Sequence, residues 1–345
     1  MTVVTESPSA RRPAGKPRVT VTRRLLPATE ARMAELFDVV LNQSDAALTR
    51  DALLAAMRES DVLVPTVTDR IDAAMIEAAG DRLGLIANFG AGTEHLSLGA
   101  ARARRIMVTN TPGVFTEDTA DLAMTMIISV PRRLPQNARM LMRGEWVGWA
   151  PSTLLGHSLH GKRLGIVGMG RIGQAVAHRA RAFGLDIVYH NRHRLPAALE
   201  NMLGARHEPD LDRLIAEADI LTLHCPASPE TRQLLNAARI ATMRPSAFVI
   251  NTARGDLIDE EALIAALEEG RLAGAGLDVY AREPAVDPRL LALPNVMLMP
   301  HLGSATIEGR EVAGERVIAN IRFWADGHRP PDQVLEGWAS APIKV

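Results

Sequence analysis

Residues 164–184 read Leu164-Gly-Ile-Val-Gly168-Met-Gly170-Arg-Ile-Gly173-Gln-Ala-Val-Ala-His-Arg-Ala-Arg-Ala-Phe183-Gly184. Small and apolar residues predict a buried parallel strand over Leu164–Val167, and apolar residues at helical spacing predict a helix that ends at Gly184. In the Gly-x-Gly-x-x-Gly between them, Gly168 permits the tight turn, Gly170 lets a pyrophosphate approach the backbone, and Gly173 lets helix and strand pack closely. A plain glycine-rich turn is the alternative, but the flanking strand and helix favour a dinucleotide site at the helix N-terminus.

The chain around this motif alternates between apolar runs and helical patterns. Between Gly161 and Pro300, apolar runs predict six strands: Leu164–Val167, Ile187–Tyr189, Ile220–Leu223, Ala247–Ile250, Gly274–Leu277 and Val296–Met299. Helices are expected between them, for example over Asp210–Glu217 and Glu260–Glu269. This alternation is typical of an α/β dinucleotide-binding domain with an open parallel sheet.

The N-terminal part of the chain repeats the alternation. Strands are predicted over Val19–Val21, Phe37–Leu41, Val62–Val64, Leu83–Ala87 and Ile106–Val108, and helices over Ala28–Phe37, Arg50–Arg58 and Ala73–Ala79. The same principles therefore predict a second open parallel sheet.

Two longer helical patterns mark the boundary between these parts. Thr116 is the expected N-cap of a helix that runs to about Arg133, and Ser304 or Thr306 is the expected cap of a last helix that returns to the first domain. The predicted organisation is a disordered tail over 1–17, a substrate-binding domain over 18–115 plus 304–340, and a dinucleotide-binding domain over 116–303.

Composition excludes several classes of function. The 345 residues carry a net charge of −1 and 3% aromatic residues, so the chain offers neither a basic surface nor stacking side chains for nucleic acid. The one cysteine, Cys225, excludes an intrachain disulfide and a cysteine zinc site, and it fits a reducing cytoplasm. No metal site is predicted. The longest apolar run, Leu122–Val130, is too short to cross a membrane.

Three residues that suit carbonyl reduction follow predicted strands of the second sheet. Arg254 can bind a carboxylate and polarise the adjacent carbonyl, and His301 as imidazolium can protonate the carbonyl oxygen while hydride reaches the carbon. Glu283 beside His301 would orient the ring and favour its charged form. Each has a plainer alternative: a structural histidine, a surface arginine, or a glutamate in a turn before Pro284. Because strand ends of one sheet face one crevice, their joint placement favours catalysis.

Cofactor choice is predicted from the end of the second run. A dinucleotide-binding site for NAD usually has Asp or Glu there, for the ribose 2′-hydroxyl. This chain has Asn191, Arg192, His193 and Arg194 instead. The predicted cofactor is NADPH in preference to NADH, with the two arginines binding the 2′-phosphate.

Several motifs occur together between Arg18 and Val334: Gly90-Ala-Gly92, Asn110-Thr-Pro-Gly-Val, Gly144-Glu-Trp-Val-Gly-Trp-Ala-Pro151, Gly168-Met-Gly-Arg-Ile-Gly173, Asn251-Thr-Ala-Arg-Gly255, Gly276-Leu-Asp-Val279, Glu283-Pro284 and Pro300-His-Leu-Gly-Ser-Ala-Thr306. With them the chain resembles the D-isomer-specific 2-hydroxyacid dehydrogenases, and within that family the glyoxylate/hydroxypyruvate reductases, or D-glycerate dehydrogenases. The tryptophan motif is the main indication of the subgroup.

The resemblance implies a Rossmann domain and a discontinuous flavodoxin-like domain that closes over the substrate. It implies that Arg254, Glu283 and His301 act as argued above, and that the amides of Ala91 and Gly92 hold the substrate carboxylate. Further implied contacts are Val67 and Trp149 for the substrate and, for the cofactor, Thr119, Arg171, Ile172, Cys225, Pro226, Thr231, Thr252, Ala253, Asp278 and Gly303. A homodimer is also implied, with Trp149 reaching toward the other chain's substrate site. From the residues alone, the loop that carries this motif (the tryptophan loop) could equally pack on the core of its own domain.

The expected activity is reduction of glyoxylate or hydroxypyruvate to glycolate or D-glycerate by hydride from NADPH, with NADH as a second cofactor. A short-form phosphoglycerate dehydrogenase, or another D-2-hydroxyacid dehydrogenase, remains an alternative. Formate dehydrogenases have Gln beside the histidine, so Glu283 argues against them. A dinucleotide-sensing corepressor of the same fold is a further alternative, which the neutral charge does not favour.

Overall fold

The computed structural model describes residues 15–335. The predicted tail over 1–17 and the end of the expected range 304–340 therefore lie mostly or partly outside the described residues. The chain forms two compact units. Unit 1 runs up to Val114 and resumes at Thr306, and unit 2 is Phe115–Ala305. Each unit is an α/β fold and is described by itself.

Unit 1 is built on five parallel strands in the order β2-β1-β3-β4-β5. Their bounds are β1 Arg18–Val21, β2 Asp38–Leu41, β3 Val62–Val64, β4 Leu85–Ala87 and β5 Met107–Thr109. This is the strand order of a flavodoxin-like doubly wound sheet, with the first strand inside and the switch point beside it. The five predicted strands are all present: β3 has the predicted bounds, and the ends of the others differ from the prediction by at most two residues.

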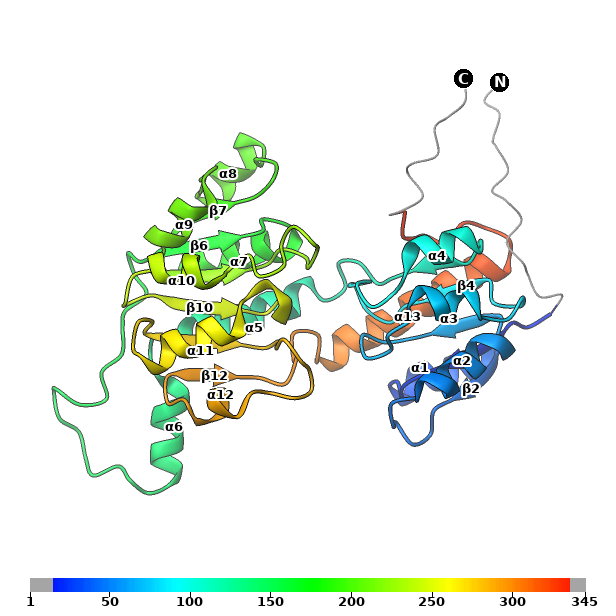
Figure 1. Ribbon diagram of the computed structural model, residues 1–345, viewed down its shortest axis with the longest axis horizontal. Helices are drawn as coiled ribbons and strands as arrows, with labels where there is room; N and C mark the ends of the chain where they lie inside the picture. Colours follow the sequence, from blue (N-terminus) through cyan, green and yellow to red (C-terminus); the bar gives the residue numbers. More distant parts are fainter. Residues whose placement is uncertain (1–14, 336–345) are drawn as a thin grey trace. The chain divides into compact units, whose positions relative to one another are not determined.

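Helices cover both faces of this sheet: α1 Pro27–Leu36, α2 Arg50–Glu59, α3 Ala73–Glu77, α4 Leu98–Ala103 and α13 Ile307–Ala325 (Figure 1). One buried cluster joins the sheet to α1 and α13 through residues such as Met33 and Trp324. A second joins it to α2, α3 and α4, for example through Met57 and Met75. Thr306 caps α13, as one of the two predicted caps, by accepting a hydrogen bond from the Gly309 amide at 3.0 Å.

Unit 2 contains seven parallel strands in the order β12-β11-β10-β9-β6-β7-β8. Their bounds are β6 Arg163–Val167, β7 Asp186–His190, β8 Ala205–His207, β9 Ile220–Leu223, β10 Phe248–Asn251, β11 Gly274–Leu277 and β12 Val296–Leu298. The order is that of a Rossmann sheet with one strand added beyond its sixth, and it changes direction between β6 and β9. Both units therefore confirm the predicted fold class. The strand β8 was not predicted, because Ala-Arg-His contains no apolar run.

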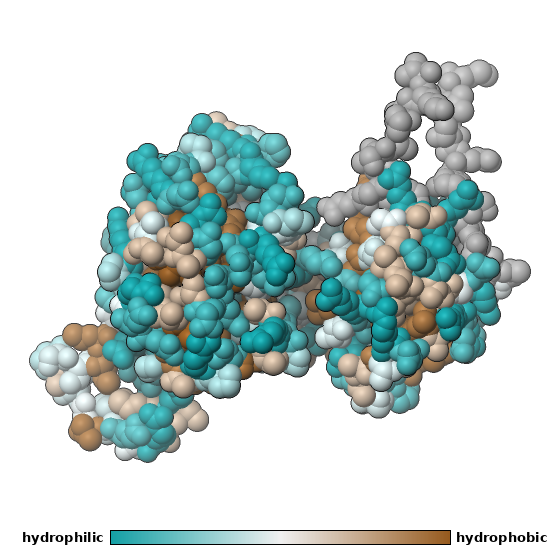
Figure 2. Space-filling model, viewed as in Figure 1, coloured by the Kyte–Doolittle hydropathy of each residue, from teal (hydrophilic) through white to brown (hydrophobic). Residues whose placement is uncertain are grey.

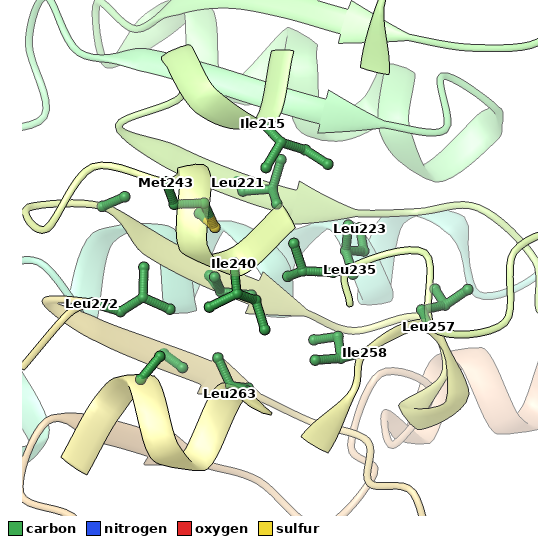
Figure 3. Close-up of a cluster of buried hydrophobic side chains, with 14 of the residues drawn as sticks. Ile215, Leu221, Leu223, Leu235, Ile240, Met243, Leu257, Ile258, Leu263 and Leu272 are labelled. Carbon is green, nitrogen blue, oxygen red and sulfur yellow. The ribbon is translucent and has the colours of Figure 1, made fainter. Parts of the chain in front are cut away.

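The sheet of unit 2 is covered by α5 Thr116–Ser129, α7 Arg171–Ala182 and α8 Ala197–Leu203 on one face. On the other face lie α9 Leu211–Glu217, α10 Ala237–Thr242, α11 Glu260–Glu268, α12 Pro288–Ala292 and the 3-10 turn η1 Gly255–Leu257. Figure 3 shows this second face, where Ile240 and Leu263 from helices and Leu221 and Leu223 from β9 belong to one buried cluster. Aliphatic side chains fill both cores, as the scarcity of aromatic residues requires.

The predicted long helix to Arg133 is wrong in length and in its cap. The helix α5 ends at Ser129, and a separate helix, α6 Leu134–Met142, begins after Arg133, whose φ is 53°. Pro131 lacks the amide hydrogen that a continuing helix needs, so the chain turns there. Thr116 is the first residue of α5 rather than its cap, because Phe115 occupies the cap position without a side-chain hydrogen bond.

Residues 15–335 contain neither a membrane-spanning helix nor a cluster of metal-ligating side chains. No helix in this range combines the length and the apolar character that a membrane span requires. In the same range no three His, Cys, Asp or Glu side chains gather in a way that could hold a metal ion.

Candidate active site

The three proposed catalytic residues follow three neighbouring strands of unit 2. Arg254 comes after β10, Glu283 lies in the loop after β11, and His301 comes after β12. Because the strands are parallel, all three loops leave the same edge of the sheet. The sequence prediction that these side chains share one end of one sheet is thus met by the strand order.

His301 and Glu283 are in direct contact. Nδ1 of His301 lies 2.7 Å from Oε2 of Glu283, and the Tyr280 amide donates to the other oxygen, Oε1, at 3.0 Å. Both side chains keep about a third of their surface exposed, 30% for His301 and 34% for Glu283. The pair is therefore fixed in geometry and still open to a small molecule.

Opposing effects act on the pKa of Glu283. Burial is the largest single influence and raises this pKa, whereas the hydrogen bond and charge of His301 lower it. The Tyr280 amide and the charge of Arg254 act in the same direction, so the net pKa lies below the ordinary value of a glutamate. Glu283 is consequently a carboxylate at neutral pH, and Arg254 is near enough for its charge to be felt there.

Asp278 holds the backbone of the loop that carries His301. Its carboxylate is fully buried and accepts hydrogen bonds from the amides of Leu302 at 2.6 Å and Gly303 at 2.9 Å. The amide of His301 donates to the Asp278 carbonyl at 2.9 Å, and His301 has a φ of 57°. Burial raises the pKa of Asp278, and the two amide hydrogen bonds oppose that rise. The resemblance implies that Asp278 contacts the cofactor; in this structure each of its carboxylate oxygens accepts a hydrogen bond from the His301 loop.

Gly255 explains how Arg254 comes close to the Glu283 loop. A Cβ at Gly255 would lie 2.0 Å from the backbone carbonyl carbon and oxygen of Tyr280, so only glycine lets the two loops touch. Asn251 shapes the turn from the other side, because its amide group donates to the Arg254 carbonyl at 2.8 Å and accepts from the Ala253 amide at 3.0 Å. The guanidinium Nη1 of Arg254 donates to the Ala253 carbonyl at 2.7 Å.

The glycine-rich turn after β6 has the geometry that its sequence predicts. Gly168 has a φ of 96°, and a Cβ there would lie 2.5 Å from the Cys225 amide nitrogen. A Cβ at Gly173 would lie 2.2 Å from the Gly168 carbonyl oxygen, so helix α7 packs directly on the turn. Nothing lies within 4 Å of a Cβ at Gly170, which is exposed. Gly170 thus leaves space beside the first turn of α7, where Arg171 and Ile172 lie.

The neighbouring strand ends fit a dinucleotide. The hydroxyl of Thr252 is buried and has no hydrogen-bond partner among residues 15–335, a condition that a polar ligand would relieve. Cys225 and Pro226 follow β9, with the backbone of Cys225 against Gly168, and burial raises the pKa of the Cys225 thiol to about 11. This thiol is therefore neutral at physiological pH. Thr252 and Ala253, which directly follow β10, would contact the bound cofactor.

Other predicted cofactor contacts make bonds within the protein. Thr231 donates to the Pro226 carbonyl at 2.7 Å and closes its loop. Thr119 on α5 donates to the Gly303 carbonyl at 2.8 Å, so it joins the long helix to the His301 loop. These bonds give Thr119, Thr231 and Gly303 a role in shaping the loops that follow β9 and β12.

At the end of β7 the positive side chains have unequal surroundings. Arg192 is exposed, and Asn191 donates to the His193 carbonyl at 3.0 Å, which closes a small turn. Arg194 forms a bidentate ion pair with Glu200, at 3.0 and 2.9 Å. A carboxylate absent from the strand-end sequence is thus brought in by helix α8.

In unit 1, the loop after β4 presents backbone amides. The carbonyl oxygens of Gly90 and Gly92 accept from Nδ2 of Asn88 at 3.0 and 2.9 Å, and that of Ala91 accepts from Nδ2 of Asn110 at 2.7 Å. The amides of Ala91 and Gly92 donate to no other group in the described residues. With its carbonyl groups turned inward, the loop can bind an anion. Val67, in a separate loop of unit 1, is 48% exposed.

The tryptophan loop extends away from its own unit. The helix α6 has no buried residue, and exposed apolar side chains run from its last residue into the loop beyond it. They include Met142 at 86%, Val147 at 102%, Trp149 at 82% and Leu155 at 62%. Figure 2 shows hydrophobic atoms at the surface in the region that Figure 1 labels α6. Within a single chain, therefore, Trp149 does not pack on a core.

Sequence reasoning missed the residues that hold the site in place. Asn88, Asn110, Asn251 and Tyr280 all lie inside or beside the quoted motifs, so their position next to a strand end was the available signal. Glu200 had no such signal, because one glutamate in a helix eight or more residues from the strand is common.

Comparison with known proteins gives consistent matches. The family model described as "D-isomer specific 2-hydroxyacid dehydrogenase, NAD binding domain" matches residues 124–303. A glyoxylate reductase of Thermococcus litoralis is 44% identical over 324 residues, which are 92% of this chain and 97% of that protein. A glycerate dehydrogenase of Hyphomicrobium methylovorum is 38% identical over 296 residues, 86% of this chain and 92% of that protein.

A solved structure agrees with the sequence matches. The NADPH-dependent glyoxylate/hydroxypyruvate reductase of Sinorhizobium meliloti, in complex with NADP and malonate, superposes with a TM-score of 0.82 at 34% identity. The match covers 94% of this chain and 98% of that chain. The match thus spans both units.

Proposed function

This chain belongs to the D-isomer-specific 2-hydroxyacid dehydrogenase family, and on that premise we propose that it reduces glyoxylate or hydroxypyruvate to glycolate or D-glycerate. The observation that carries the proposal is the group of Arg254, Glu283 and His301 at three adjacent strand ends, with His301 and Glu283 in contact at 2.7 Å. Relatives that are named glyoxylate reductase and glycerate dehydrogenase support the substrate class.

The chemistry assigned to each residue follows from its type and surroundings. A bound nicotinamide dinucleotide supplies the hydride. Arg254 polarises the carbonyl of the keto acid, and His301 donates the proton that converts the carbonyl oxygen to a hydroxyl. Glu283 stays ionised, holds the imidazole by Nδ1 and leaves Nε2 to donate the proton.

Two parts of the substrate need binding residues: its carboxylate and the side chain at its other end. We assign the carboxylate to the amides of Ala91 and Gly92, which Asn88 and Asn110 orient. Val67 is assigned to the substrate's side chain, where a larger residue would favour glyoxylate over hydroxypyruvate.

The preference for NADPH is proposed from the end of β7. Residues 191–194 carry two arginines and no carboxylate, and the S. meliloti relative is named NADPH-dependent. A 2′-phosphate carries the charge that Arg192 and Arg194 are suited to bind. NADH would remain a poorer cofactor.

A homodimer is proposed from the exposed apolar surface of α6 and the tryptophan loop. Side chains such as Val147 and Trp149 would lose their exposure against a second copy of the chain. In this arrangement Trp149 contributes to the substrate site of the other chain.

The test is to assay a panel of 2-keto acids with each cofactor and to measure the rate at which the reduced dinucleotide is oxidised. The proposal expects the highest kcat/KM with glyoxylate or hydroxypyruvate and NADPH. Preferred turnover of phosphohydroxypyruvate would assign the chain to the phosphoglycerate dehydrogenases instead. No turnover of any keto acid, together with tight dinucleotide binding, would favour a sensor and contradict the proposal.

A further inference from the structure

Arg194, one of the two arginines predicted to bind the 2′-phosphate, is held by the carboxylate of Glu200 in helix α8. Nε and Nη2 of Arg194 donate to Oε1 and Oε2 of Glu200 at 3.0 and 2.9 Å. The side chain of Arg194 is 66% exposed, whereas that of Glu200 is only 8% exposed. The carboxylate of Glu200, in the middle of α8, is therefore buried, and the guanidinium of Arg194 extends from it toward solvent.

Tyr189 joins this pair to the backbone of the loop. Its ring is fully buried at the end of β7, and its hydroxyl donates to Oε1 of Glu200 at 2.8 Å. The same hydroxyl accepts a hydrogen bond from the amide of Leu195 at 2.8 Å. One tyrosine thus ties α8 to the segment that follows Arg194, so the loop has a defined conformation without a ligand.

The pairing occupies one edge of the guanidinium and leaves the other. A guanidinium has five N–H donors in a planar fork, and the Glu200 pair uses the edge formed by Nε and Nη2. Nη1 of Arg194 has no hydrogen-bond partner in the part of the chain that the structure describes. Hydrogen bonds from Arg194 and Tyr189 hold the pKa of Glu200 below its ordinary value, so the pair persists at neutral pH.

We propose that Glu200, supported by Tyr189, is a positioning residue for cofactor choice, which holds Arg194 by one edge so that its other edge binds the 2′-phosphate of NADPH. The inference rests on the proposed preference for NADPH. An arginine that is already oriented loses little side-chain freedom when it binds an anion, and this would favour the phosphate.

An argument from charge alone predicts the opposite effect of Glu200 on binding of the 2′-phosphate. A carboxylate near the phosphate repels it, so loss of the Glu200 charge alone would strengthen phosphate binding. Loss of the bidentate anchor would weaken it, because the NH2 group of Gln would replace one acceptor oxygen and face one of the two Arg194 donors. The direction of the change therefore separates positioning from repulsion.

The experiment measures binding of 2′,5′-ADP and 5′-AMP by calorimetry to the wild type, Glu200→Gln and Tyr189→Phe. Glu200→Gln is expected to weaken 2′,5′-ADP roughly tenfold and to leave 5′-AMP within a factor of about two. Tyr189→Phe, which keeps the ion pair, should lose less, and it serves if Glu200→Gln does not fold. In turnover, KM for NADPH should rise at unchanged kcat.

Asp186→Asn is the matched control, because Asp186 lies at the opposite end of β7 and pairs with Arg206. It should change neither affinity. Unchanged or stronger binding of 2′,5′-ADP by Glu200→Gln, or equal weakening of both ligands, would overturn the role of Glu200 alone. Equal affinity of the wild type for both ligands would overturn the NADPH preference and this inference together.

Discussion

The acid pair is the most specific feature at the residue scale. Glu283 touches His301 through one oxygen and is held by the Tyr280 amide through the other, so neither side chain can turn away without losing a bond. The net pKa of Glu283 lies below its ordinary value. Its charge is therefore present throughout the neutral range, in which His301 must carry and release a proton.

Glu283→Gln tests this pairing. The amide keeps the size of the side chain but removes the charge that stabilises the imidazolium, so the upper pH limb of kcat should move to lower pH. The measurement is kcat for glyoxylate reduction between pH 5 and 9. Glu260→Gln is the control, since Glu260 bonds to the Ala281 amide of the same loop. Coincident profiles for Glu283→Gln and wild type would contradict the assignment.

A second histidine makes the stability of unit 2 depend on pH. His224 follows β9, with Nε2 at 2.9 Å from the Thr222 hydroxyl, and burial lowers its pKa from 6.5 to about 4. Below pH 6.5 the His224 imidazole is protonated in the unfolded chain, but in the folded chain it stays neutral down to about pH 4. Folding stability is therefore lost as pH falls through this range. Above pH 6.5 the contribution is complete.

His224→Gln should therefore reduce the loss of stability on acidification. Between pH 7.5 and 5 the wild type should lose on the order of 2 kcal/mol more than the variant, visible as a difference of several degrees in the thermal midpoint. His178→Gln, at an exposed position of α7, should behave as the wild type. The same acid sensitivity in His224→Gln as in the wild type would show that this histidine does not titrate on unfolding.

At the element scale, the site depends on contacts between strand-end loops. The sequence predicted the strands and, through them, which residues end on one edge, because hydrophobic runs and glycine turns are local signals. It could not predict that Gly255 touches the backbone of Tyr280 or that α8 carries Glu200 under Arg194. These contacts join segments more than ten residues apart or use common residue types, so no local pattern marks them. The break between α5 and α6 at Pro131 is marked by a local signal, because proline lacks the amide hydrogen that a continuing helix needs.

Gly255→Ala tests the contact between the two loops. The new methyl group would overlap the Tyr280 carbonyl, so we expect a loss of about 1–3 kcal/mol in stability and at least a tenfold lower kcat/KM, since Arg254 must shift. Gly99→Ala in α4 is the control, because nothing lies within 4 Å of its Cβ and alanine favours a helix. Wild-type stability and kcat/KM in Gly255→Ala would refute the contact.

At the scale of the whole molecule, the chain is organised as two α/β units with one unit inserted into the other. The chain leaves unit 1 at Val114 and returns at Thr306, and α13 then completes the core of unit 1. The apolar surface of α6 and the tryptophan loop belongs to neither core. This surface is what a second chain would cover.

Val147→Glu combined with Leu155→Glu tests the dimer. Both side chains are exposed in the single chain, so the variant should fold as the wild type does, while buried charges at the interface should weaken association at least tenfold. The measurement is the mass in solution by light scattering, with two chains expected for the wild type and one for the variant. Phe183→Glu, an exposed position outside this surface, should stay dimeric. A wild type of one-chain mass would end the proposal.

The most direct test of the acid is kcat of His301→Gln with glyoxylate and NADPH. Glutamine can donate a hydrogen bond but cannot give up a proton, so kcat should fall roughly 10²-fold or more while the affinity for the dinucleotide stays the same. A variant that retains a third or more of the wild-type kcat would show that the proton comes from another group and would contradict the proposed site.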